Sequence, residues 1–187
     1  MPHPIARLAL PILGLCAAAF ATPASAQTTL EKIRLYAVSE SHQLIAVSAA
    51  DPQKITRSVT LYGLAPNERI LGIDYRVAYG VMFALGSSGR VFTVDVDNGA
   101  LKPVGDAPFA LALEGTRFGV DFNPAADRIR IVSDSGQNLR VHPETGALVD
   151  SKPDVDGLQP DGALAFASDD ANAGRAPHVI AAAYTYN

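Results

Sequence analysis

The sequence repeats itself with a period of 47 residues, and this repeat limits the possible folds more than any other feature. Residues 72–101 align with residues 119–148 without a gap, and nine of the 30 aligned positions are identical. The identical pairs include Gly72 with Gly119 and Asp74 with Asp121, and both segments close on Gly-Ala-Leu. A weaker copy relates residues 35–52 to residues 82–99 through their apolar pattern. Such a period is typical of an array of stacked, similar units.

Each unit has the pattern of four short strands joined by tight turns. In the best-defined unit the expected strands are Ile70–Arg76, Val81–Ser87, Arg90–Val96 and Leu101–Gly105, with turns at Val77–Gly80, Ser88-Gly89 and Asp97–Gly99. No stretch sustains the 3.6-residue apolar period of a helix. One four-stranded sheet covers both of its faces only when neighbouring sheets stack on it. We therefore predict an all-β, β-propeller-like array of four-stranded antiparallel blades with a period of 47 residues.

The strand count does not close a ring. The first unit begins near Ile33, already in its second strand, and the last unit supplies only Ala163–Ala167 and Val179–Tyr186. The expected total is 13 strands, which is an incomplete ring of about three and a half blades. We therefore expect a C-terminally truncated repeat domain, or an open stack whose last strand has an exposed edge.

Residues 1–26 have the features of a secretory signal peptide. Arg7 precedes an apolar run over Leu8–Phe20, and Ala24-Ser25-Ala26 forms a small-residue cleavage site. The apolar run is shorter than the roughly 20 residues that a bilayer-spanning helix needs. Cleavage leaves residues 27–187 as the repeat domain, without the single cysteine, Cys16. We predict a periplasmic or extracellular protein with no membrane span after cleavage.

The composition and motifs exclude several functions. The net charge of −4 argues against nucleic-acid binding, which needs a basic surface. No nucleophile or phosphate-loop motif occurs, and the three histidines of the repeat domain do not lie at metal-ligand spacing. An acidic loop over residues 154–170 lacks the order of an EF-hand, so we expect it to be solvated rather than a calcium site. We therefore predict no catalytic residue, no metal site and no cofactor.

The third unit, which contains residues 119–148, differs from the second, which contains residues 72–101, in a way that packing alone does not require. Polar side chains replace three apolar residues of the second unit, Val81, Phe83 and Val91, and three polar ones change identity. The six residues of the third unit are Arg128, Arg130, Asp134, Gln137, Asn138 and Arg140. We treat these six residues as a candidate binding site, since guanidinium groups recognise carboxylates and phosphates. The alternative is a structural ion-pair network between blades, because a buried arginine needs an acidic partner. Asp127, Asp134 or an acid of a neighbouring blade would supply it.

Two function classes remain open. The first is an exported binding scaffold for a small polar or anionic ligand, a glycan or a protein. The second is an exported propeller enzyme of hydrolase or lactonase type, whose site would lie at the central channel near Asp74 and Asp121. No histidine accompanies these two acids, so the sequence favours binding over catalysis.

Several particular runs resemble a known family. They are Phe118–Pro124, Asp127–Asp134, Gly136–Arg140, Asp161–Phe166, Asp170–Gly174 and Ala182–Thr185. The chain from about Ile33 to Asn187 resembles the bacterial family catalogued as domain of unknown function four-three-nine-four. The resemblance implies a propeller-like, exported protein whose further repeats continue beyond the last of these runs. The family has no assigned activity, so the resemblance implies no catalytic residues. Members usually have Tyr-Thr-Asn where this chain has Tyr184-Thr-Tyr-Asn187.

Overall fold

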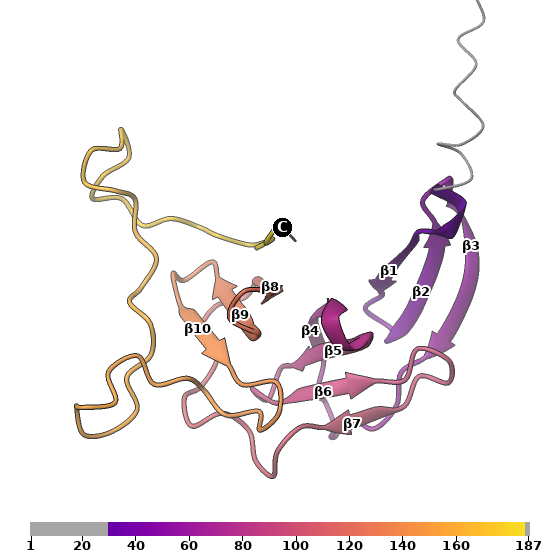
Figure 1. Ribbon diagram of the computed structural model, residues 1–187, viewed down its shortest axis with the longest axis horizontal. Helices are drawn as coiled ribbons and strands as arrows, with labels where there is room; N and C mark the ends of the chain where they lie inside the picture. The colour runs from indigo at the N-terminus through magenta and orange to yellow at the C-terminus, as the bar shows by residue number, and fades with distance from the viewer. Residues whose placement is uncertain (1–29, 186–187) are drawn as a thin grey trace, which may run out of the picture.

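The computed structural model describes residues 30–185 as an all-β fold of ten strands in three antiparallel sheets (Figure 1). The first sheet contains β1 (Arg34–Val38), β2 (Gln43–Ser48) and β3 (Asp51–Thr60) in that order. The second contains β4 (Ile70–Arg76), β5 (Val81–Gly86), β6 (Val91–Val94) and β7 (Leu101–Pro103). The third contains β8 (Phe118–Asn123), β9 (Arg128–Ser133) and β10 (Asn138–Val141). A short 3₁₀ helix, η1 (Val77–Tyr79), lies between β4 and β5, and residues 30–32 form a helical turn before β1.

The strands follow the repeat that the sequence predicts. β5 begins at Val81 and β9 at Arg128, 47 residues later, and β6 and β10 keep the same interval. The turn after β4 contains Gly80 in the left-handed conformation, at φ 65°. The first unit supplies three strands, as predicted. The all-β class and the antiparallel units of period 47 are therefore confirmed.

The three sheets stack face to face through two apolar cores. The first core joins the first sheet to one face of the second through Leu44, Leu61, Met82, Ala84, Phe92, Val94 and Leu101. The second core joins the opposite face of the second sheet to the third through Phe83, Leu85, Val91, Phe122, Ile129, Ile131, Leu139, Val141 and Leu148. In Figure 1 the sheets follow one another around a curve, with β1, β4 and β8 toward its inside.

The third unit has three strands, not the predicted four. Its fourth strand is reduced to one bridge between Val141 and Leu148. The chain then turns away because the Asp150 carboxylate accepts hydrogen bonds from the backbone N–H groups of Lys152 and Gln159. A side chain that bonds the nearby backbone in this way competes with the ladder of a sheet.

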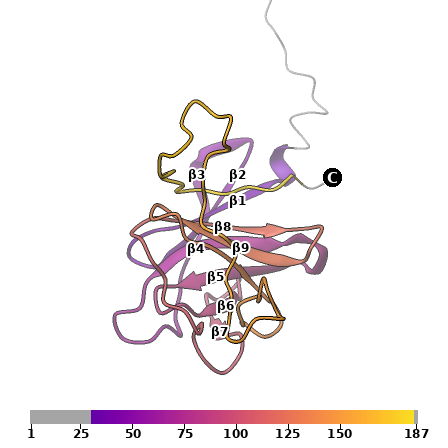
Figure 2. The same cartoon turned by 90° about the vertical axis from the view of Figure 1, so that its left-hand side faces the viewer.

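The two strands predicted near the C-terminus are not strands in the described residues (Figures 1 and 2). Leu164 N–H donates to the carbonyl of Gly136, as Phe109 N–H donates to that of Gly89. Residues 161–166 therefore correspond to residues 106–111, which connect the second unit to the third. They belong to the third unit rather than to a fourth. The sequence analysis assigned them to a fourth unit, and that assignment was wrong.

The last described residues occupy the position of a first strand rather than a second. A Cβ atom built on Gly119 would meet the backbone of Ala181 at 2.6 Å, and one built on Gly72 would meet the side chain of Val120 at 2.6 Å. Tyr184 thus lies against the third unit where Phe122 lies against the second, 62 residues earlier. The interval is longer than 47 because loops are inserted on both sides of residues 161–166.

The signal peptide predicted over residues 1–26 lies outside the described residues. Between residues 30 and 185, no helix has the length and apolar character needed to cross a membrane.

Candidate functional site

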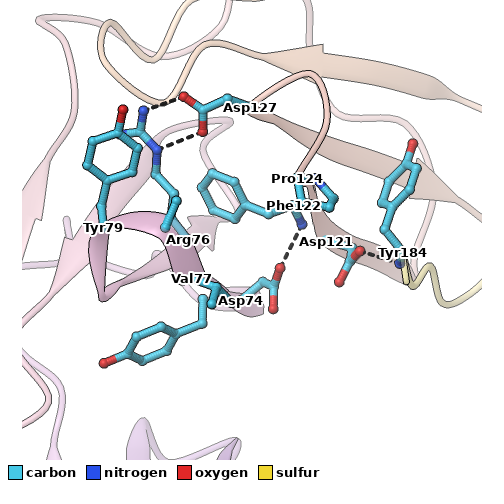
Figure 3. A pocket seen from close by; sticks show the side chains of 11 residues that line it. Asp74, Arg76, Val77, Tyr79, Asp121, Phe122, Pro124, Asp127 and Tyr184 are labelled. Carbon is cyan, nitrogen blue, oxygen red and sulfur yellow. Dashed lines mark hydrogen bonds and ion pairs between the residues drawn. The ribbon is translucent and has the colours of Figure 1, made fainter. Parts of the chain in front are cut away.

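A cavity of about 310 Å³ lies between the second and third sheets, on the inner side of the curve (Figure 3). β4 and η1 form one wall, β8 and the turn after it form another, and Tyr184 approaches from the C-terminal segment. The lining residues are Asp74, Tyr75, Arg76, Val77, Ala78, Tyr79, Asp121, Phe122, Pro124, Asp127 and Tyr184. Four of them are aromatic and four are charged, so the cavity combines apolar surface with convergent polar groups.

Asp74 and Asp121 occupy equivalent positions in the two units and make equivalent contacts. Asp74 Oδ2 accepts a hydrogen bond from the backbone N–H of Phe122 at 2.6 Å. Asp121 Oδ2 accepts one from the backbone N–H of Tyr184, also at 2.6 Å. Each carboxylate therefore ties its own unit to the next segment of chain, and Figure 3 shows both at the cavity. One oxygen of each carboxyl group makes these bonds.

The surroundings of Asp121 favour its protonated form. Its pKa is raised to about 6, first because burial disfavours the charged carboxylate and also because Asp74 repels it. The Tyr184 N–H opposes this shift by bonding to the carboxylate. Arg130, the residue opposite Asp121 in the ladder, forms its ion pair with Asp161 instead.

Arg76 forms the charged rim of the cavity, and each of its three guanidinium nitrogens contacts a carboxylate. Only 8% of its side chain is exposed. Its Nε and Nη2 donate to the two carboxylate oxygens of Asp127, the first at 2.8 Å, and its Nη1 pairs with Glu144 at 2.6 Å. Its guanidinium also lies 3.8 Å from the centre of the Tyr79 ring. These contacts raise the pKa of Arg76 and lower that of Asp127, so the pair remains ionised.

Asp127 holds this contact from an unusual backbone position. Its φ is 50°, in the left-handed region, and the equivalent residue of the second unit is Gly80. A non-glycine residue rarely adopts this conformation, although aspartate tolerates it better than most. The third unit thus carries a carboxylate where the second needs only a flexible turn.

Three of the six predicted site residues lie together, and the two arginines among them contact an acid rather than open space. Arg140 makes a bidentate pair with Asp161, at 2.7 and 2.6 Å, and Arg130 contacts the same carboxylate at 2.9 Å. Asn138 accepts a hydrogen bond from Arg130 and donates to the carbonyl of Gly162. These contacts lower the pKa of Asp161 and raise that of Arg140.

The other three predicted residues lie apart from this cluster. Arg128 donates to the backbone carbonyls of Ala126 and Asp127. Asp134 accepts hydrogen bonds from the backbone and hydroxyl of Thr116 and has a pKa lowered to about 2 by them. Gln137 bonds the backbone of Ala112 and Glu114. Asp134 and Gln137 therefore hold the connection between the second and third units.

No cluster in residues 30–185 has three histidine, cysteine or acidic side chains placed to hold a metal ion. His178 Nδ1 lies 3.0 Å from the carbonyl oxygen of Asp134, and burial lowers the pKa of His142. In the acidic loop, Asp170 bonds the backbone N–H of Asn172, two residues away.

Sequence reasoning identified Asp74 and Asp121 but missed Arg76, Tyr79 and Tyr184. Arg76 lies at the end of a predicted strand, and its partners are 51 and 68 residues away. One signal was available, since aspartate replaces Gly80 at position 127 in an otherwise similar turn. Tyr184 could not be placed because its register depends on two inserted loops.

The comparisons with known proteins give a family and no described activity. No curated protein matches the chain. The sequence profile named Domain of unknown function (DUF4394) matches residues 43–187, which is most of the chain. The protein therefore belongs to the DUF4394 family.

Proposed function

We propose that this protein is an exported, propeller-like binding module that holds a small ligand in the cavity between β4 and β8. The observation that carries the proposal is the cavity itself, because its volume of about 310 Å³ falls within the range of small-molecule sites. Its walls come from two repeat units and a third segment of chain.

The lining supports a binding role. Small-molecule sites are usually apolar clefts with a few placed polar groups. Here Tyr75, Tyr79, Phe122 and Tyr184 supply aromatic surface, and Asp74 and Asp121 supply fixed acceptors whose positions are set by backbone hydrogen bonds.

Export and the propeller arrangement belong to the same proposal. The apolar run and cleavage site over residues 1–26 support export, and N-terminal sequencing of the secreted product should begin at Gln27. An uncut N-terminus retained in the cytoplasm would overturn this part. The stacking of each sheet on the next supports the propeller, whose channel would lie beside the cavity.

The binding role can be tested by filling the cavity. Ala78 lines it from η1 and is exposed, so Ala78→Trp should occlude the site without disturbing either core. Ala50→Trp is the matched control, because Ala50 is an exposed residue of the β2–β3 turn in the first sheet and does not line the cavity. Ligand-observed NMR against a panel of cationic, neutral and anionic small molecules should find binders that Ala78→Trp loses and Ala50→Trp keeps. Binding that is equal in both variants would overturn the proposal.

One observation favours an enzyme as the second candidate. Asp121, whose pKa is raised by burial and by the neighbouring Asp74, is a carboxyl group of the kind that can act as a general acid. A hydrolase of this kind would lose turnover of glycoside, ester or lactone substrates in Asp121→Asn. Turnover that the variant retains would exclude Asp121 from the chemistry.

For the predicted arginine cluster, the contacts favour the ion-pair alternative. Asp161 accepts from both Arg130 and Arg140, so it supplies the acid that the sequence required from a neighbouring segment. A ligand role for the six predicted residues remains a prediction, and an added anion would have to compete with Asp161 for these guanidinium groups.

A further inference from the structure

We infer that the cavity between β4 and β8 selects a small organic cation, such as a primary or quaternary amine, over neutral and anionic molecules. This inference rests on the proposed binding function and names the chemical class of its ligand. It is carried by the balance of charge in the cavity wall and by the aromatic side chains around it.

The wall has an excess of negative charge. It contains three carboxylates, Asp74, Asp121 and Asp127, and one cation, Arg76. Lysine and histidine are absent from the lining residues. The wall therefore offers an ionic partner to a cation and repels an anion.

Arg76 cannot serve as the anchor for an anionic ligand. Three of its nitrogens are bonded to carboxylates, two to Asp127 and one to Glu144, and one face of its guanidinium is against Tyr79. An anion would have to displace these contacts. Asp127 is likewise committed to Arg76, which leaves Asp74 and Asp121 as the acids available to a ligand.

The two available acids are held in place by the backbone. Asp74 is bonded to the N–H of Phe122 and Asp121 to the N–H of Tyr184, each through Oδ2. The two carboxyl groups also lie within hydrogen-bonding reach of each other, so one ammonium group could contact both. Because an ammonium carries positive charge, it also relieves the repulsion between the two carboxylates, which no neutral ligand can do.

Aromatic rings complete the recognition of an organic cation. Four aromatic residues line the same cavity. Tyr79 and Tyr184 are exposed, whereas Phe122 is buried in the second core and Tyr75 packs against the first. The negative face of an aromatic ring attracts alkylammonium groups, and sites for quaternary ammonium ligands are commonly built from such rings. A bare metal ion would use the carboxylates but not the rings, so the combination favours an organic cation.

The test compares choline with 3,3-dimethyl-1-butanol, which has the same shape without the charge. Titration of the full chain at pH 7.5, followed by calorimetry or NMR shifts, should give saturable choline binding that is at least tenfold tighter than binding of the neutral alcohol. Asp74→Asn should weaken choline by tenfold or more and leave the alcohol unchanged. Ala78→Trp should abolish choline binding, and Ala50→Trp should preserve it.

The outcomes separate this inference from the function on which it rests. Equal binding of choline and the alcohol, lost in Ala78→Trp, would overturn cation selectivity and leave the binding site intact. In a second outcome, choline and tetramethylammonium both fail to bind while a neutral or anionic molecule of the panel binds and is lost in Ala78→Trp. That result would also overturn cation selectivity and leave the binding site intact. Choline binding that Ala78→Trp does not affect would overturn both.

Discussion

The contact of Arg76 with Asp127 shows how one changed residue can join two repeat units. Asp127 stands where the second unit has a glycine, and its carboxylate reaches a buried arginine on β4. A hydrogen bond to a buried charged group contributes more than an exposed ion pair does, because water competes less with it. Asp127 should therefore contribute more to the free energy of folding than an exposed aspartate usually does.

The Asp127→Asn substitution should lower the free energy of unfolding by about 2 kcal/mol, since it removes a charge-assisted pair but leaves Glu144 beside Arg76. Asparagine also tolerates a positive φ, so the backbone itself should not suffer. Asp97→Asn is the control, because its pair with Arg57 is exposed, with 79% of the Asp97 side chain accessible. That change should cost at most about 0.5–1 kcal/mol in urea unfolding. Equal losses would show that the Arg76 contact adds nothing.

Asp121 should contribute to stability in a pH-dependent way. Its pKa in the folded protein, about 6, is above the ordinary 3.8, so protonation stabilises the fold. That contribution is present at low pH and is lost as the pH rises through about 6. The groups around Asp121 are Asp74 on β4, Arg130 on β9 and Tyr184 on the C-terminal segment.

Urea midpoints at pH 5 and pH 7.5 test this. The drop in stability between them should be smaller in Asp121→Asn than in the unchanged protein. Asp134→Asn serves for comparison, because the pKa of Asp134 is about 2 and it is ionised at both pH values. Asp134→Asn should leave the difference between the two pH values unaltered. A wild-type pH profile retained in Asp121→Asn would contradict the assignment.

The sequence predicted the site residues that occur in both repeat units. It predicted only some of the contacts made by residues that differ between the units. Comparison of the two copies identified Asp74 and Asp121 and the run of arginines, because the repeat shows which changes packing does not need. It did not reveal that Asp161 would form ion pairs with both Arg130 and Arg140. That pairing depends on the path of a loop that has no counterpart of equal length in the second unit.

At the scale of elements, the strands that pack between sheets were predicted best. The predicted β4 limits match the observed ones, and β5 is one residue shorter than expected. The missing fourth strand of the third unit and the terminal segment were predicted wrongly. In both, backbone N–H groups donate hydrogen bonds to the carboxylates of Asp150 and Asp121, and these bonds replace the backbone ladder that strand patterns assume.

The close approach of the terminal segment to β8 predicts a specific steric effect. Gly119→Ala would place a Cβ atom 2.6 Å from the backbone of Ala181, and backbone cannot move aside as a flexible side chain can. The substitution should displace residues 181–184, break the Asp121–Tyr184 hydrogen bond and increase cleavage after residue 178 in limited proteolysis.

Gly162→Ala is the matched control for this effect. Gly162 has open space around its Cβ position and no positive φ, and it lies in the same C-terminal region. Its substitution should leave the cleavage pattern unchanged. Proteolysis that is equally fast in both variants, or unchanged in Gly119→Ala, would show that the segment is not held against β8.

For the whole molecule, stacking links all three sheets into one stability unit. The second sheet supplies opposite faces to both cores, with Met82 and Phe92 on one and Phe83 and Leu85 on the other. Loss of either core would expose one entire face of the second sheet. The three sheets should therefore unfold together rather than separately.

Phe83→Ala tests this coupling at the second core. Phe83 is 4% exposed and meets Phe122 edge-to-face, with ring centroids 5.2 Å apart. Truncation should cost about 3–5 kcal/mol through lost burial and the cavity it leaves. Leu44→Ala, at the first core, should cost about 2–5 kcal/mol, whereas Ile55→Ala on the exposed face of β3 should cost less than about 1 kcal/mol. Both core variants should shift the same single transition, monitored by circular dichroism and by tyrosine fluorescence. Two transitions, only one of which responds to Phe83→Ala, would instead mean that the first sheet folds independently. Each core would then stabilise the two sheets beside it without coupling all three.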